Sequence, residues 1–248
     1  KPLALNAKDA EAMVENARKN GTFFMEAMWT RYYPLTQKIA SLLKEGRIGE
    51  VVSFDAKLGF PADLALPRLG EKSHGASALL DVGIYALTMA SLALGPGAPK
   101  EIKAIGKMSQ NADFDLAFAA TLQYPSGGLA TVQGSFLGAL ENNATIVGTK
   151  GRIHWLNHWC PTSFTVIDAD GTSTTYDEST NPEYALPNSP GHVFNFKNSQ
   201  GLAHEARYIQ NALERGLKES EHESIEESLT IMRTIDTIAK QIGFDNSS

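Results

Sequence analysis

The sequence predicts an α+β protein with an open, mostly antiparallel sheet and helices on one face, preceded by a single αβ unit. Residues 101–176 consist of β-branched and alternating apolar runs separated by turns at 125–128 and 168–171, a pattern typical of antiparallel strands. Two amphipathic helical patterns follow, and we expect both to pack on one face of the sheet. Near the start, a helical pattern precedes a glycine and a short aromatic run.

This N-terminal segment has the pattern of one αβ unit. Residues 7–20 carry apolar side chains at helical spacing and stop at Gly21, whereas residues 22–27 are short, aromatic and apolar, as in a buried strand. One such unit is not stable alone and normally adds to a parallel sheet. We therefore expect residues 1–27 to be the end of one domain and residues 28–248 to form another.

The elements after residue 28 are predicted from the spacing of apolar residues and from the positions of proline and glycine. Pro34 favours a helix start, and Gly83 weakens or interrupts a second helical pattern. Three prolines within 178–198 predict a long surface segment. The predicted helices are 34–46, 76–94, 202–213 and 225–242, and the predicted strands are 51–58, 102–108, 116–124, 129–136, 145–147, 153–156 and 164–167.

Composition limits the classes of function. The hydrophobic content of 42% and the length of 248 residues are those of a folded chain with its own core. Cys160 is the single cysteine, which excludes an intramolecular disulfide and a Cys-rich zinc site and makes a reducing, cytoplasmic location the expectation. A formal charge of −6 gives no reason to expect nucleic acid or anionic lipid as a partner. We also expect no membrane span, because no apolar run approaches about 20 residues.

Two histidines have the spacing of a possible metal-ligand pair. His154 and His158 are four residues apart, which on a helix could face one metal ion. Trp155, Trp159 and Pro161 around them favour a strand and a loop instead. We therefore expect no metal site, and a structural or substrate-facing role for these histidines.

Asp81 and Tyr85 form a more informative pair. On a helix their spacing of four places carboxylate and phenol on one face. From the spacing alone, the favoured interpretation is a helix N-cap and a half-buried aromatic residue. A phenol with a pKa near about 10 acts as an acid or base at neutral pH only when a positive charge stabilises its anion. Lys1 could supply that charge if the fold brings it there.

Six blocks of the sequence, in order, resemble the Gfo/Idh/MocA oxidoreductases, and in particular their dimeric dihydrodiol dehydrogenase branch, which includes D-xylose dehydrogenases. Lys1-Pro2 resembles the end of the family's Glu-Lys-Pro motif, whose lysine and proline lie at the edge of the nicotinamide pocket. The other blocks are EAMWTRYYP at 26–34, ALLDVGIY at 78–85, GTKGRI at 148–153, WCPT at 159–162 and GLAHEA at 201–206.

The resemblance implies roles for individual residues. Tyr85 would be the acid/base residue assisted by Lys1, and Asp81 would orient this pair or the substrate. Trp29 and Arg31 would line the nicotinamide and substrate pocket, for which a core tryptophan and a structural salt bridge are the alternatives. The implied catalytic residues are Lys1, Tyr85 and Asp81; the substrate-binding residues are Trp29, Arg31 and Trp159; the cofactor-binding residues are Lys1, Pro2, Trp29 and Arg31.

The resemblance also implies a cofactor and partners. It implies an NADP-linked oxidation, with NAD as the other option, of a trans-dihydrodiol or an aldose such as xylose, by a homodimer that uses the open sheet face. Family members carry a Rossmann domain with a glycine fingerprint before the Glu-Lys-Pro motif, and this sequence has no Gly-x-Gly-x-x-Gly. Residues 1–27 would be the end of that dinucleotide-binding domain and residues 28–248 the substrate-binding and dimerisation domain.

The missing fingerprint leaves two interpretations. The sequence is either a fragment of a longer oxidoreductase or a truncated homologue. In the second case the chain would be a structural or dimerisation module that does not bind dinucleotide, because contacts to nicotinamide alone leave the pyrophosphate unneutralised.

Overall fold

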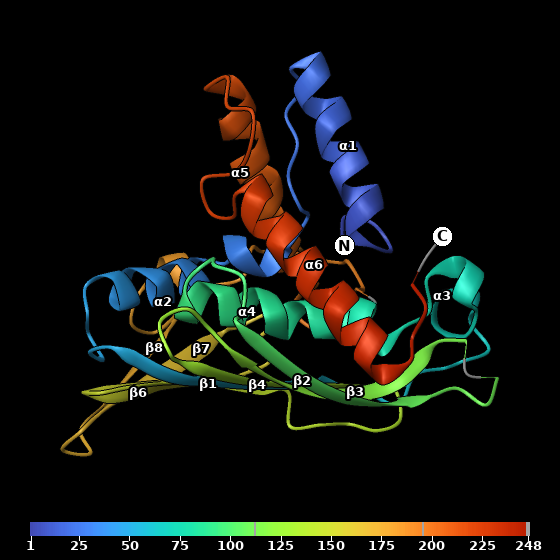
Figure 1. The fold of residues 1–248 in the computed structure, drawn as a ribbon. Helices are drawn as coiled ribbons and strands as arrows, with labels where there is room; N and C mark the ends of the chain where they lie inside the picture. Colours follow the sequence, from blue (N-terminus) through green and yellow to red (C-terminus); the bar gives the residue numbers. More distant parts are fainter. Residues whose placement is uncertain (112, 195, 247–248) are drawn as a thin grey trace.

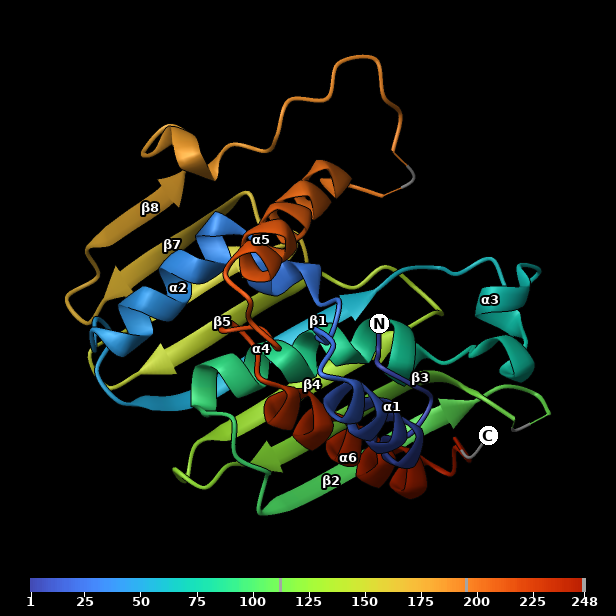
Figure 2. The same ribbon diagram turned by 90° about the horizontal axis from the view of Figure 1, so that it is seen from above.

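The computed structural model describes residues 1–111, 113–194 and 196–246, and its main body has two layers (Figure 1). One layer is an open sheet of eight described strands in the order β2-β3-β4-β1-β5-β6-β7-β8. All neighbouring strands are antiparallel except β1 and β4, which run parallel. Helices α2, α4 and α6 form the other layer, and none of the described helices lies on the opposite sheet face (Figures 1 and 2). The predicted fold class is confirmed.

Most elements agree closely in their bounds with the predicted segments, because periodicity is a local property of the sequence, whereas β8 (Ser173–Asp177) and α3 (Pro67–Gly70) are additional to them. The strands are β1 (Val51–Gly59), β2 (Glu101–Met108), β3 (Asp115–Gln123), β4 (Leu129–Ser135), β5 (Asn143–Gly148), β6 (Gly151–Leu156), β7 (Ser163–Asp168) and β8 (Ser173–Asp177). The α-helices are α1 (Ala7–Asn20), α2 (Pro34–Lys44), α3 (Pro67–Gly70), α4 (Ile84–Leu94), α5 (Leu202–Glu214) and α6 (Ile225–Ile242). Short turns of helix include η1 (Trp29–Tyr32) and the π-helix η3 (Leu79–Gly83).

The core lies between α4 and the sheet. Almost every residue of α4 is buried, which is typical of a helix that is apolar on all sides. By length and composition the helical stretch Lys72–Leu94 could cross a membrane, so the expectation that no segment is apolar enough needs correction. However, 89% of its apolar window is buried inside the protein, which identifies it as a core helix.

Two predicted features are wrong. Residues 22–27 are not a strand: the backbone N–H of Phe24 donates to the carbonyl of Lys218 at 3.0 Å, in the connection between α5 and α6. An apolar run predicts burial, but only a neighbouring strand makes an extended segment part of a sheet. Of the two C-terminal helices, α6 packs on the sheet as predicted, whereas α5 rises away from it and packs on η1 (Figure 1). An amphipathic stripe predicts that a helix buries one face, but not against which element.

On the sheet face turned away from the helices, the central row of side chains is polar, whereas Ile105, Leu129 and Leu156 on the same face are exposed hydrophobic residues. One residue from each strand lies in register across this face, and most of them are only partly exposed. Thr145 Oγ1 and His154 Nδ1 are hydrogen bonded within the row at 3.0 Å, as are the hydroxyls of Thr165 and Thr175 at 3.1 Å. The row consists of Lys103, Thr121, Thr131, Asp55, Thr145, His154, Thr165 and Thr175.

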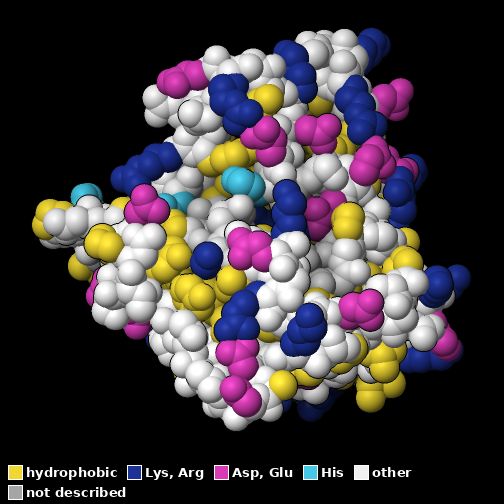
Figure 3. All heavy atoms as spheres, turned by 90° about the vertical axis from the view of Figure 1, so that its left-hand side faces the viewer, with side chains coloured by type: hydrophobic (Ala, Val, Ile, Leu, Met, Phe, Trp, Pro, Cys, Tyr) yellow, Lys and Arg dark blue, Asp and Glu magenta, His cyan; other side chains and the backbone are white. Residues whose placement is uncertain are grey.

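Charge is dispersed over the side of the molecule shown in Figure 3. Lysine and arginine side chains alternate there with aspartate and glutamate, and hydrophobic side chains lie between them. This side therefore presents no extended surface of one sign, in keeping with the small formal charge of the chain.

Candidate active site

The site is built around the π-helix η3, which leads into α4. Asp115 of β3 anchors the start of this turn: it is fully buried, accepts a hydrogen bond from the Leu79 N–H at 2.9 Å and is bonded by the Ser77 hydroxyl. Single π-turns inside helices occur frequently at functional sites, because the wider turn redirects side chains. Here the turn carries Asp81, and Tyr85 follows it in the first turn of α4.

Lys1 lies against Asp81 and Tyr85. Its Nζ donates to the carbonyl oxygen of Asp81, lies 3.4 Å from Asp81 Oδ1 and is 4.4 Å from the centre of the Tyr85 ring. Burial lowers the pKa of Lys1, and the charge of Asp81 opposes this shift. The fold thus brings Lys1 together with Asp81, 80 positions later in the sequence, and with Tyr85, the three residues that the resemblance assigns to catalysis.

The environment of Tyr85 determines which proton state it holds. Tyr85 is buried, and its phenolic oxygen accepts a hydrogen bond from Trp29 Nε1 at 2.8 Å. Burial raises the pKa of Tyr85 well above its ordinary value, while the Trp29 hydrogen bond acts in the opposite direction. At neutral pH the group is therefore a phenol, which can donate a proton as it stands.

The helix-cap alternative for Asp81 does not describe this structure. No side-chain cap is formed at η3 or α4, and the Asp81 carboxylate instead accepts from Arg68 Nη1 at 2.9 Å and faces Lys1. Asp81 Oδ1 is thus shared between Lys1 Nζ and Arg68 Nη1. Asp81 therefore holds Lys1 through two groups, its backbone carbonyl oxygen and its carboxylate.

Aromatic rings form the wall beside Tyr85. Trp29 packs edge-on against Tyr33 and Trp159, with ring centres 5.5 Å and 5.8 Å apart, and Trp159 lies 6.3 Å from Tyr85. The Thr30 hydroxyl donates to the Trp159 carbonyl at 2.5 Å and ties the two segments together. Trp159 Nε1 is buried without a hydrogen-bond partner. Apolar walls with a few available polar groups are typical of small-molecule sites.

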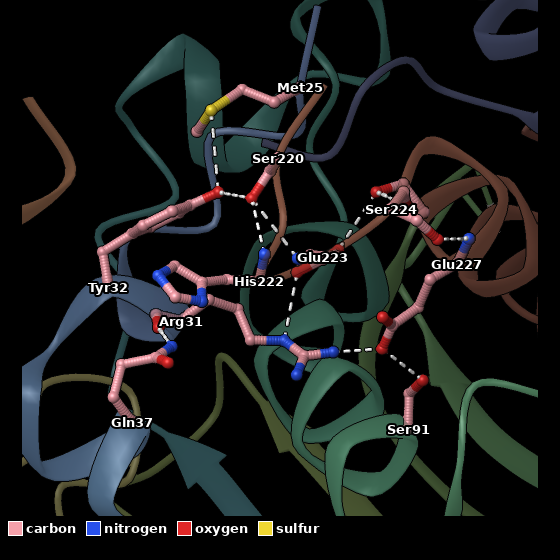
Figure 4. Close-up of polar contacts among 11 residues, drawn as sticks. Met25, Arg31, Tyr32, Gln37, Ser91, Ser220, His222, Glu223, Ser224 and Glu227 are labelled. Atoms are coloured by element: carbon pink, nitrogen blue, oxygen red, sulfur yellow. Dashed lines mark hydrogen bonds and ion pairs between the residues drawn. The ribbon is translucent and has the colours of Figure 1, made fainter. Parts of the chain in front are cut away.

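Arg31 does not join this group. Its side chain is 2% exposed; its Nε donates to Glu223 Oε2 at 3.2 Å, and its Nη2 pairs with Glu227 Oε1 (Figure 4). This geometry corresponds to the structural salt bridge that the sequence left as the alternative for Arg31.

Sequence reasoning missed two groups beside the predicted residues. Arg68 joins Lys1, Pro2 and Asp81 in lining a cavity of about 280 Å³. Glu205 of α5 is buried, its Oε1 has no hydrogen-bond partner, and burial raises the pKa of its carboxyl to about 7. No periodicity or spacing distinguishes either residue; only the position of Glu205 inside the GLAHEA block gave a signal.

The two histidines do not meet at a metal ion. His154 lies on β6 and is bonded to Thr145, whereas His158 is fully buried in the following loop and burial lowers its pKa to about 4. Within the described ranges, no group of three His, Cys, Asp or Glu residues could hold a metal. Burial also raises the pKa of the Cys160 thiol to about 12, which leaves it unreactive at neutral pH.

Fold and site together define an oxidoreductase-type α+β domain, in which a lysine, an aspartate and a tyrosine meet at an aromatic wall. The GFO/IDH/MocA C-terminal domain model matches residues 36–154. Trans-1,2-dihydrobenzene-1,2-diol dehydrogenase of Sus scrofa is 33% identical, with 98% of this chain and 69% of the relative covered. The Danio rerio enzyme of the same name is 35% identical at the same coverage. The chain belongs to the Gfo/Idh/MocA family of oxidoreductases.

Solved structures share the fold. An aldose-aldose oxidoreductase from Caulobacter crescentus, complexed with glycerol, superposes with a TM-score of 0.77 at 20% identity over 97% of this chain and 68% of the other. A 3-ketoreductase from Actinomadura kijaniata, in complex with NADP and TDP-benzene, has a TM-score of 0.75 at 23% identity over 98% and 69%. The predictions of the family and of an enzyme of the dehydrogenase class are confirmed.

Proposed function

We propose that this chain forms the substrate-binding part of an NADP-linked dehydrogenase that acts on a secondary alcohol of a trans-dihydrodiol or of an aldose such as xylose. The observation that carries the proposal is the placement of the Tyr85 phenol between the Trp29 indole and the Lys1–Asp81 pair. The names of the relatives support the substrate class. NADP is favoured by the ketoreductase complex, and NAD is the alternative because an Agrobacterium radiobacter oxidoreductase of the same fold was solved with NAD⁺.

The residues present fit the nicotinamide end of such a cofactor. Lys1 and Pro2 line the cavity beside Asp81, and the buried indole N–H of Trp159 has no partner in the protein. No glycine fingerprint occurs in the sequence, so the pyrophosphate would need residues outside this chain. We accordingly assign residues 1–27 to the end of a dinucleotide-binding domain and residues 28–248 to the substrate-binding and dimerisation domain.

The mechanism follows from the proton states of the site. The nicotinamide, when bound, supplies hydride transfer. During reduction, the Tyr85 phenol donates its proton to the substrate oxygen; during oxidation, the phenolate takes the hydroxyl proton back. The Lys1 cation and the Trp29 N–H both stabilise that phenolate, and Asp81 keeps Lys1 over the ring. Trp29 and Trp159 exclude water from one side of the reacting oxygen.

A second candidate is a non-catalytic structural or dimerisation module. The missing glycine fingerprint favours it, whereas the assembled Lys1, Asp81 and Tyr85 favour the enzyme. In either case we propose a cytoplasmic homodimer joined through the open sheet face. Titration of this chain with the reduced dinucleotide, followed by nicotinamide fluorescence, separates the affinity of this segment from that of a longer polypeptide.

Replacing Tyr85 tests the proposed reaction. Tyr85→Phe removes the transferable proton but keeps the ring in its packing position, so turnover should fall roughly 10²–10⁴-fold while the KM for cofactor stays near the wild-type value. The measurement is nicotinamide absorbance at saturating dihydrodiol or xylose in the full-length protein. Near-normal turnover of a folded Tyr85→Phe protein would exclude Tyr85 as the acid/base residue.

A further inference from the structure

The buried ion cluster around Arg31 connects elements that carry the proposed active site (Figure 4). Arg31 follows Trp29 by two residues on η1, and its guanidinium lies between the carboxylates of Glu223 and Glu227. The described residues that line the cavity at Lys1 do not include Arg31 or either of its carboxylate partners. Ligand contact in that cavity therefore does not account for this cluster.

Glu227 is the junction of the cluster. Its Oε1 pairs with Arg31 Nη2 and also accepts from the Ser91 hydroxyl at 2.6 Å (Figure 4). Arg31 belongs to η1, Ser91 to α4 and Glu227 to the first turn of α6, where the side chain of Ser224 accepts from the Glu227 N–H at 3.1 Å. One carboxylate oxygen thus fixes three separate elements relative to one another.

Glu223 restricts Arg31 from a second direction. Its Oε2 accepts from Arg31 Nε, and its Oε1 accepts from the Ser228 hydroxyl at 3.1 Å, so the carboxylate cannot rotate without losing a bond. Charge-assisted hydrogen bonds of this kind are about twice as strong as neutral ones and are directional. The guanidinium therefore has one well-defined orientation on η1.

The elements joined by Glu227 carry the two partners of the key hydrogen bond. Trp29 lies on η1, Tyr85 lies on α4, and their side chains are 2.8 Å apart, Nε1 to oxygen. A hydrogen bond weakens steeply once donor and acceptor separate beyond about 3.5 Å. A shift of η1 relative to α4 of less than about 1 Å would therefore remove the Trp29 donor from the Tyr85 oxygen.

We propose that Arg31, Glu227 and Ser91 form a positioning clamp that fixes the Trp29 donor on the Tyr85 phenolic oxygen. The clamp makes Arg31 a positioning residue rather than one that touches substrate or cofactor. Its catalytic consequence rests on the proposed function, since the donor matters to turnover only if Tyr85 transfers the proton. Its geometric consequence, the position of the Trp29 donor relative to the Tyr85 oxygen, does not depend on the proposed function and can be measured in the absence of turnover.

The test measures the NMR chemical shift of the Trp29 indole N–H in protein labelled with ¹⁵N-tryptophan. The chain has three tryptophans; the indole nitrogen of Trp155 is buried without a hydrogen-bond partner among the described residues and serves as the internal reference, whereas Trp159 packs against Trp29 and does not. Ser91→Ala removes the link to α4, and Glu227→Gln keeps the shape of the junction but removes its charge. Both variants should shift the Trp29 resonance upfield and leave that of Trp155 in place. Trp29→Phe assigns the signal.

Activity provides the second readout, with a matched control. In the full-length protein we expect Ser91→Ala and Glu227→Gln to lower kcat roughly tenfold or more with little change in cofactor KM. Glu226→Gln is the control, because Glu226 is the preceding residue of α6 and its side chain pairs with Arg18 at the surface at 2.8 Å. It should leave the indole spectrum and turnover unchanged.

The outcomes separate the clamp from the proposed function. Folded Ser91→Ala and Glu227→Gln proteins with an unchanged Trp29 resonance would overturn the clamp. Ser91→Ala keeps the test decisive if Glu227→Gln does not fold, because only one neutral donor is lost. A displaced Trp29 resonance with normal turnover would support the clamp geometry and contradict the contribution of the Trp29 donor to turnover, whereas the role of Tyr85 itself is tested by Tyr85→Phe.

Discussion

Around the aromatic wall, burial displaces the pKa values of three side chains of different chemistry. It lowers the pKa of Lys1, raises that of Tyr85 beyond its ordinary range and raises that of Glu205 to about 7. In each case desolvation of the charged form is the largest cause. Of these three groups, Glu205 titrates closest to neutral pH, and its Oε1 has no hydrogen-bond partner among the described residues; burial also raises the pKa of Glu223, in the Arg31 cluster, to about 7.

Glu205 should make the stability of the protein depend on pH. Its folded pKa of about 7 exceeds the ordinary glutamate value of 4.5, so the native state binds more protons than the unfolded state between these values. The contribution of Glu205 to the free energy of unfolding is present below about pH 4.5 and is lost as pH rises through about 7. Urea unfolding at several pH values should show that the free energy of unfolding of Glu205→Gln falls less between about pH 4.5 and 7 than that of the wild-type protein.

A second glutamate of the same helix provides the control for this effect. Glu214→Gln, on the exposed side of the same helix α5, should leave the pH dependence of stability as in the wild type. If the free energy of unfolding changes with pH equally in Glu205→Gln and in the wild-type protein, Glu205 is not protonated in the native state near neutral pH.

At the scale of the element, the π-helix η3 determines where Asp81 and Tyr85 point. Asp115 holds its first residues, and Gly83 at its end lies against Phe118 of β3. A Cβ atom at residue 83 would approach two ring atoms of Phe118 to 2.6 Å. The sequence suggested a weak point or a break at Gly83, and the structure shows instead that the glycine permits close packing of this turn on the sheet.

Gly83→Ala should therefore destabilise the protein. The added methyl group overpacks a buried contact, for which about 1–3 kcal/mol is typical, even though alanine favours helix more than glycine does. The free energy of unfolding from urea titration measures the effect. Gly138→Ala is the matched control, because an added Cβ there meets no atom within 4 Å. A Gly83→Ala protein as stable as this control would contradict the packing argument.

At the scale of the whole molecule, no helix in the described part of the chain covers one face of the eight-stranded sheet (Figure 1). Its row of threonines with Lys103, Asp55 and His154 lies in register across the sheet and carries few charges. Partly exposed short side chains on such a face suit the close approach of an identical surface, since a two-fold axis pairs each patch with itself. This is the physical support for the proposed homodimer.

A charge at the centre of that face should separate the dimer. Thr131 lies between Thr121 and Asp55 in the row, so Thr131→Arg places a long cation inside the proposed interface without touching the core. Light scattering should give twice 26.8 kDa for this wild-type chain and 26.8 kDa for the variant. Thr237→Arg, on an exposed position of α6, is the control. A wild-type monomer, or a Thr131→Arg dimer, would contradict the proposed interface.

The sequence by itself determined the secondary structure, the fold class and the family. Periodicity is local, so the amphipathic helices and alternating strands could be predicted from neighbouring residues, and the motif blocks identified Lys1, Asp81 and Tyr85 as a set. Local patterns failed where the outcome depended on a distant partner. Residues 22–27 have no strand beside them, and α5 packs on η1 rather than on the sheet.

The tertiary structure decided which residues act together. Only the fold places Lys1 over the Tyr85 ring and turns Arg31 toward Glu223 and Glu227. Burial, which displaces the pKa values of Tyr85 and Glu205, likewise depends on elements more than a hundred residues apart. The physical reason is that charge interactions and desolvation act through space, whereas the patterns that a sequence displays are set by neighbours along the chain.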